Sequence, residues 1–260
     1  MASKLSAAAT LLAVVLAIDA TVFTDILEWK PSAGLDPYPV AFKQLATDVY
    51  RQGYDWHLPN GQVGDVHVYL IKLGEDYVLV DVGAPTADYE QIPSSGLRQA
   101  LQNGRLRLIT LTHGHFDHVG ALVSLMKEYP DVQVLFHEAE APFLTGESGD
   151  ISDAKGLSVQ KPAWAAPRGS ISFHRGHGHA PGHVSYLHKP SLSLIADDIF
   201  NNEGQPPQIR LPPEVFTPNV TEAELSLKKI AQLDFVKAFC GHDRAEGVTR
   251  EALQQYFKIL

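Results

Sequence analysis

Three histidines and an aspartate fall within the six-residue segment His113-Gly114-His115-Phe116-Asp117-His118. The segment directly follows the aliphatic run 106–111, which predicts a buried strand. In open α/β folds the carboxyl ends of such strands carry the chemistry. Neutral imidazole is the commonest protein ligand for zinc-like ions, and a carboxylate completes a borderline-hard ligand set. The sequence therefore predicts a metal centre at the end of a buried strand.

The wider segment 112–120, Thr-His-Gly-His-Phe-Asp-His-Val-Gly, resembles the signature of the metallo-β-lactamase-fold hydrolases. That family's pattern has four further stations, and all of them occur in order between residues 66 and 243. They are Asp81 in Leu79-Val80-Asp81-Val82-Gly83, the G-H-x-x-G-H motif at 178–183, Asp197 in the run 194–200, and Gly241-His242. The resemblance implies an α/β fold, an αβ/βα four-layer sandwich with the metal site at the sheet edges.

The resemblance also implies two divalent metal ions, with zinc as the expected metal and iron or manganese as alternatives. It assigns His113, His115 and His179 to one ion, Asp117, His118 and His242 to the other, and Asp197 to the position that bridges them. Asp81 and His183 are expected to support these ligands from behind.

Two of these assignments depend on register. In the family the first histidine of G-H-x-x-G-H is the ligand, which favours His179 over His183. The G-D-x-x-F register likewise favours Asp197 over Asp198 as the bridge. His177 stands where a proline is usual, which puts an extra imidazole near the rim of the metal site.

The activity that the resemblance implies is hydrolysis of a small ester, lactone or thioester by a metal-activated hydroxide, with Asp117 as the catalytic residue. β-Lactams and phosphoesters are alternative substrates. An alternative of another class is a mononuclear iron oxidoreductase of the sulfur-dioxygenase kind on the same fold, which metal analysis would distinguish. A degenerate scaffold without activity is disfavoured because no ligand position is empty.

The glyoxalase II and lactonase-like branch fits best, because both Asp197 and His242 are present. Glyoxalase II enzymes carry an additional C-terminal helical domain, whereas only residues 243–260 follow His242. Bacterial homoserine-lactone hydrolases have a tyrosine three residues after the bridging aspartate, where this chain has Phe200. The identity of the substrate stays open.

The net charge of −9 and the absence of a basic stripe interleaved with aromatic residues argue against a nucleic-acid partner. A small-molecule substrate is expected instead. A chain of 260 residues with 45% hydrophobic residues can bury one sizeable core, and its single cysteine, Cys240, excludes an intramolecular disulfide framework. The oligomeric state is not determined by these features.

The amino terminus resembles a signal peptide. Lys4 precedes the apolar stretch from Leu5 to Ile18, which is short for a membrane span, and Ala20 offers a cleavage point. We therefore expect residues 1–20 to be removed and the protein to be secreted, without stable membrane insertion. A helix packed on a cytoplasmic domain and a membrane anchor are the alternatives. The sequon Asn219-Val220-Thr221 is weakly consistent with secretion.

Periodicity and turn residues divide the rest of the chain into an N-terminal extension, 21–64, packed on a metallo-β-lactamase-like domain, 65–260. The extension is expected to contain one helix, around 41–50. Strands are predicted at 66–73, 77–82, 106–111, 132–136, 184–188, 192–195 and 235–239. Helices are predicted at 97–102, 119–129, 221–233, with Thr221 as its cap, and 249–259. The segments 138–170 and 201–218 show no regular pattern.

Overall fold

A computed structural model describes residues 41–57, 63–84, 93–144, 166–203, 208–242 and 246–258. The predicted signal peptide lies outside the described residues, as do most of the predicted extension and residues 145–165 of the loop predicted at 138–170.

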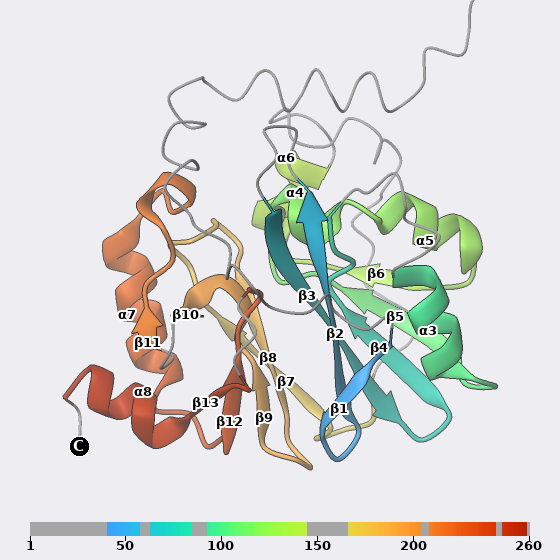
Figure 1. Cartoon of the computed structure of the whole chain (residues 1–260). Coiled ribbons are helices and arrows are strands. Elements are labelled where there is room, and N and C mark those ends of the chain that lie inside the picture. The colour runs from blue at the N-terminus through green and yellow to red at the C-terminus, as the bar shows by residue number, and fades with distance from the viewer. Residues whose placement is uncertain are drawn as a thin grey trace, which may run out of the picture.

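Two sheets face each other at the centre of the molecule (Figure 1). The first has the strand order β1-β2-β3-β4-β5-β6, and the second has the order β13-β12-β9-β8-β7. The strands of the first sheet are β1 (Lys43–Ala46), β2 (Val49–His57), β3 (Val63–Leu73), β4 (Asp76–Val80), β5 (Arg105–Thr110) and β6 (Gln133–Leu135). Those of the second are β7 (Ile171–Arg175), β8 (Val184–His188), β9 (Ser193–Ile195), β12 (Lys237–Phe239) and β13 (Val248–Thr249). A separate hairpin pairs β10 (Asn201–Glu203) with β11 (Gln208–Arg210).

Helices cover the outer face of each sheet, so that the layers run helix, sheet, sheet, helix (Figure 1). The α-helices are α3 (Pro93–Leu101), α4 (Phe116–Val119), α5 (Leu122–Glu128), α6 (Ala141–Leu144), α7 (Val220–Ile230) and α8 (Arg250–Tyr256). Three short 3-10 turns are η1 (Glu138–Glu140), η2 (Asp197–Ile199) and η3 (Glu214–Phe216). The expected four-layer sandwich is confirmed.

The alternation of side chains along each strand builds this arrangement, because successive residues point to opposite faces of a sheet. In β3, Tyr69 and Ile71 point into the core between the two sheets, whereas Leu70 points to the outer core beneath α3 and α5. In β9, Ile195 faces the first sheet and Leu194 packs beneath α7 and α8. Nearly every position of these strands is therefore buried.

The predicted strands and helices of the domain match the observed elements to within a few residues, and 184–188 is β8 itself. The helix predicted at 41–50 is wrong, because β1 and β2 form an antiparallel hairpin there that pairs onto β3. Its turn places Asp48 at φ 61°, a left-handed conformation that aspartate tolerates. The strand β7, the hairpin of β10 and β11 and the short helices η1 and α6 were not predicted.

No helix in the described ranges is long and apolar enough to cross a membrane.

Candidate metal centre

The predicted ligands meet at one edge of the sandwich because each follows a strand end or turn on that side. His113 and His115 lie between β5 and α4, and Asp117 and His118 lie on α4 itself. His179 lies in the turn between β7 and β8. Asp197 begins η2 after β9, and His242 follows β12. Since β9 pairs parallel with β12, and β4 with β5, their carboxyl ends open on the same edge.

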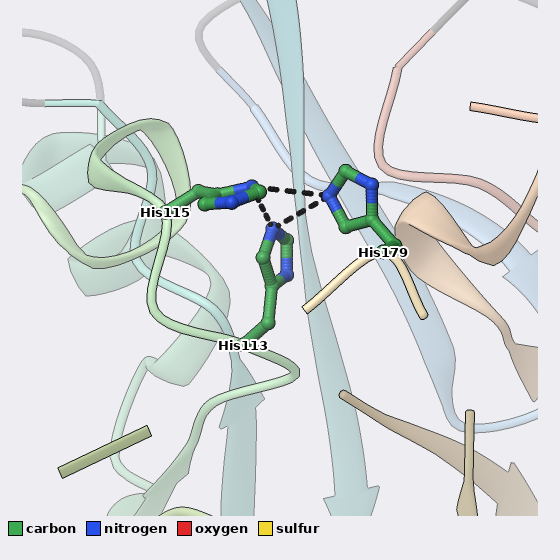
Figure 2. Close-up of side chains that lie close together, drawn as sticks. All are labelled: His113, His115 and His179. Carbon is green, nitrogen blue, oxygen red and sulfur yellow. Dashed lines mark hydrogen bonds between the residues drawn. The ribbon is translucent and has the colours of Figure 1, made fainter. Parts of the chain in front are cut away.

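Three imidazoles converge on one point (Figure 2). His115 Nδ1 lies 2.9 Å from His113 Nε2 and 3.0 Å from His179 Nε2, and the two Nε2 atoms lie 3.3 Å apart. Nitrogens bound tetrahedrally to one zinc ion at 2.0–2.1 Å would be separated by about 3.3 Å. One shared proton could not satisfy three such lone pairs, so the arrangement fits a cation.

A second group lies beside the first and consists of Asp117, His118 and His242. Asp117 Oδ2 is 3.5 Å from His242 Nε2 and 3.7 Å from His118 Nε2. Within the described part of the chain, His118 Nε2 is buried without a hydrogen-bond partner. A buried nitrogen that faces a carboxylate and carries no partner is again the geometry of a metal ligand.

Asp198, the neighbour of the predicted bridge, lies between the two groups. Its Oδ2 atom is 3.1 Å from His242 Nε2, 3.3 Å from His118 Nε2 and 3.5 Å from His179 Nε2. The same oxygen is 3.9 Å from His113 Nε2. It therefore faces ligand nitrogens of both groups.

Asp197 reaches the opposite side of the same imidazoles. Its Oδ2 atom lies 3.2 Å from His118 Nδ1 and 3.4 Å from His113 Nδ1, and it accepts a short hydrogen bond from the Thr112 hydroxyl. His113, His118 and Asp197 are all buried and make up a third group of side chains that could hold a metal ion. The prediction that Asp197 bridges the ions stays a prediction.

The rear nitrogens of the histidines contact acceptors that set their orientation. His118 Nδ1 lies 3.2 Å from Asp81 Oδ2, His179 Nδ1 lies 3.2 Å from Thr217 Oγ1, and His242 Nδ1 lies 2.5 Å from the Asp65 carbonyl oxygen. A proton held at Nδ1 leaves the Nε2 lone pair facing forward, which is the form that binds a metal.

Asp81 occupies the supporting position that the resemblance assigned to it. Its Oδ1 accepts from the Thr112 backbone N–H at 2.7 Å, and its Oδ2 lies 2.7 Å from Thr112 Oγ1. Burial, with the nearby charge of Asp197, raises the pKa of Asp81 to about 7, against the hydrogen bonds from His118 and Thr112. This aspartate thus ties the start of the histidine loop to the end of β4.

The pKa values of histidines in the two groups shift in opposite directions. Burial lowers the pKa of His113 and His179 well below the usual value, with neighbouring imidazoles adding to the shift. Burial acts in the same direction on His118 and His242, but carboxylates outweigh it and hold both pKa values well above 6.5. Asp197 is the largest of these influences on His118, and Asp198 is the largest on His242.

His183 and His177 lie on either side of the His179 turn. His183 is fully buried, and its ring centroid is 5.4 Å from that of His113. Neither of its nitrogens has a hydrogen-bond partner among the described residues, and burial lowers its pKa to about 4. His177 is not among the candidate ligand groups found in the described chain; its Nδ1 lies 2.6 Å from the Pro181 carbonyl oxygen.

Sequence reasoning missed several residues that touch the site. Thr217 and the Asp65 backbone contact His179 and His242 from segments 38 and 177 residues away. The buried carboxylate of Glu140 accepts a hydrogen bond from the Gly114 N–H, between two of the ligands. No local motif marks these positions, although a glutamate in a buried helical turn is an unusual residue that burial prediction could have singled out.

Among the described residues, the site has a buried floor and a partly exposed side, which we call its mouth. His113, His118 and Asp197 are completely buried, whereas His115, Asp117 and His242 are partly exposed. Four carboxylates, those of Asp81, Asp117, Asp197 and Asp198, crowd this space, and divalent cations would offset their repulsion. Open positions at the mouth would let a bound ion contact water and a substrate, as catalytic sites require.

The model of the metallo-beta-lactamase superfamily matches residues 61–242. The chain is 28% identical to the probable metallo-hydrolase YybB of Bacillus subtilis, over 65% of this chain and 77% of that protein. It is 27% identical to a hydroxyacylglutathione hydrolase of Aliivibrio fischeri, over 69% of this chain and 62% of that protein. The structure is similar to a metallo-beta-lactamase from Pontibacter korlensis, with a TM-score of 0.65 and 16% identity over 84% of this chain and 97% of that one.

Proposed function

The chain belongs to the metallo-beta-lactamase superfamily and is a metal-dependent hydrolase, and we propose that it uses two divalent ions to hydrolyse a small ester, lactone or thioester. One observation carries this proposal. The set His113, His115 and His179 lies beside the set Asp117, His118 and His242, and the carboxylate of Asp198 faces both; a third set, His113, His118 and Asp197, shares its histidines with these two. A single structural ion would need only one such set.

We assign the first ion to His113, His115 and His179, as the nitrogen distances favour. The second is assigned to Asp117, His118 and His242. For the shared carboxylate we propose Asp198 in place of Asp197, because Asp198 Oδ2 faces the Nε2 atoms, whereas Asp197 Oδ2 faces the Nδ1 atoms. Zinc suits this mixture of imidazole and carboxylate ligands, with iron and manganese as alternatives.

Ions in this site would supply Lewis acidity to a substrate oxygen and would lower the pKa of water. Asp117 is partly exposed at the mouth and lies within 4 Å of both His118 and His242. From there its carboxylate can orient the attacking water and carry a proton to the leaving group. The buried histidines keep their orientation through contacts at Nδ1, so the residues that meet the substrate need not reorganise during the reaction.

Acyl compounds come first among the candidate substrates, because the chain is similar to a hydroxyacylglutathione hydrolase. The acidic net charge of −9 supports a small substrate over a polyanion. The proposal is therefore tested with a panel of lactones, esters and thioesters, with a β-lactam and a phosphodiester as comparisons.

Elemental analysis of the purified protein is expected to give about two divalent ions per chain. Asp117→Asn is expected to lower kcat on the best substrate of the panel by at least about 100-fold with metal in excess, because the amide cannot move a proton. The exposed Asp131→Asn makes the same chemical change away from the site and is expected to leave kcat unchanged. A single iron per chain, or near-normal turnover in Asp117→Asn, would contradict the two-metal hydrolase.

A further inference from the structure

Glu140 is a buried carboxylate that no ligand set uses. It ends η1, after β6, and only 1% of its surface is exposed. Burying an ionised carboxylate is costly unless hydrogen bonds compensate it. Its two oxygens point at two different loops of the metal site.

The first contact is with the loop between β5 and α4. Glu140 Oε2 accepts a hydrogen bond of 2.8 Å from the backbone N–H of Gly114, which lies between His113 and His115. The second contact is with the turn between β7 and β8. Glu140 Oε1 accepts a short hydrogen bond from the backbone N–H of Gly182, three residues after His179.

Both partners are glycines, and the packing explains why. A Cβ atom at Gly114 would lie 2.8 Å from both Glu140 Oε2 and Phe143 Cβ, and one at Gly182 would lie 2.8 Å from His137 Nδ1 and 2.9 Å from Glu140 Oε1. Such contacts are too close, so a side chain at either position would displace the carboxylate together with its neighbour. The two loops are thus shaped to receive this carboxylate.

The two loops also come from different halves of the sandwich. His113 and His115 follow the first sheet, whereas His179 belongs to the second. We propose that Glu140 is a positioning residue, which holds these two loops together through the N–H groups of Gly114 and Gly182 and so preorganises the three-histidine metal site. This role rests on the proposed function in so far as that site takes a metal.

The two metal sites are tested separately, each in a variant that lacks one ligand of the other site. His242→Ala leaves the three-histidine site as the complete one, and His115→Ala leaves the Asp117, His118 and His242 site. In the His242→Ala background, Glu140→Gln is expected to weaken zinc binding by about 10–100-fold, as loss of outer partners of ligands does. The reason is that the amide nitrogen of the new glutamine cannot accept a hydrogen bond from the second backbone N–H group. In the His115→Ala background the change is expected to stay within about threefold, well below that loss.

Two variants act as comparisons. Glu138→Gln makes the same substitution in η1 on an exposed side chain and is expected to leave both zinc affinities unchanged. Glu140→Asp keeps the charge but shortens the side chain by one methylene group, so it is expected to weaken zinc binding at the three-histidine site as well. Equal weakening of both sites by Glu140→Gln, or no weakening at the three-histidine site, would overturn the proposal.

A measurement on the metal-free protein tests the proposal without an activity assay. In the metal-free protein, amide hydrogen exchange at Gly114 and Gly182 is expected to be slow, and Glu140→Gln should accelerate it at one or both positions. Unchanged exchange at both glycines would refute the connection between the loops. If the wild-type chain bound no zinc at all, the proposed function would fail, while this exchange measurement would still decide whether Glu140 joins the loops.

Discussion

At the residue scale, the carboxylates of the adjacent residues Asp197 and Asp198 lie on opposite sides of the same histidine rings. Asp197 has φ 55°, a left-handed conformation, whereas Asp198 has φ −76°. This change of backbone direction sends one carboxylate to the Nδ1 atoms and the other to the Nε2 atoms. Aspartate is one of the few residues that adopt the left-handed region at modest cost.

Substitution of each aspartate by asparagine should distinguish their roles. Asp198→Asn is expected to reduce the bound metal from about two ions per chain to one or fewer, because it removes charge from the face that both sites share. Asp197→Asn is expected to retain two ions when zinc is in excess and to lower affinity by about 10–100-fold, as loss of an outer partner does. Metal content after equilibration at fixed free zinc measures both effects. The reverse order would restore Asp197 as the bridge.

At the scale of elements, the start of α7 supports the turn that carries His179. The Asn219 N–H donates to the Gly178 carbonyl at 3.1 Å, and Thr217 contacts the His179 ring. A Cβ atom at Gly178 would lie 2.1 Å from the Ala223 nitrogen, so helix and turn are in direct contact. The helix was predicted to begin with Thr221 as its cap. Its cap is Asn219 instead, whose side chain accepts from the Glu222 N–H at 3.0 Å.

The cap assignment is testable through stability. Asn219→Ala is expected to lower the free energy of unfolding by about 1 kcal/mol, because an N–H of the first turn loses its acceptor. Thr221→Ala lies inside the helix and is expected to change it by less than about 0.5 kcal/mol. Urea unfolding of protein made in a bacterial host measures both without glycosylation at the sequon. A larger loss for Thr221→Ala would support the cap predicted from the sequence.

At the scale of the whole molecule, the metal centre joins the two halves of the sandwich. Each proposed site takes ligands from both sheets, since His179, His242 and the shared Asp198 follow strands of the second sheet, whereas His113, His115, Asp117 and His118 follow the first. Ions that bind only the folded chain stabilise it by mass action. Zinc should therefore raise the melting temperature, and a chelator should lower it.

The dependence of zinc binding on pH should differ between the sites. His118 and His242 have pKa values raised well above 6.5, so at neutral pH zinc must displace protons from them. His113 and His179 have lowered pKa values and are already neutral. As pH falls from about 8 to about 6, the Asp117, His118 and His242 site is expected to lose zinc first. Zinc titrations of His115→Ala and His242→Ala at several pH values measure each site alone. Earlier loss from the three-histidine site would contradict this order.

Local sequence determined the metal chemistry and most of the secondary structure. The spacing of H-x-H-x-D-H sets which side chains can reach one point from a single turn, and the structure brings all seven predicted ligands to one edge of the sandwich. Mainly aliphatic runs such as 106–111 identify strands that are largely buried on both faces. These features depend on neighbours within a few residues, and so a single sequence reveals them.

Tertiary structure alone decided the rest. Residues 43–57 form strands because β3 offers them a partner, which a helical reading of 41–50 could not detect. Tertiary structure sends the Asp197 carboxylate to the Nδ1 side and the Asp198 carboxylate to the Nε2 side of the histidines, and Thr217, Asp65 and Glu140 reach the site from distant segments. Such contacts arise only when the chain closes on itself, because their partners are fixed by packing and not by spacing along the sequence.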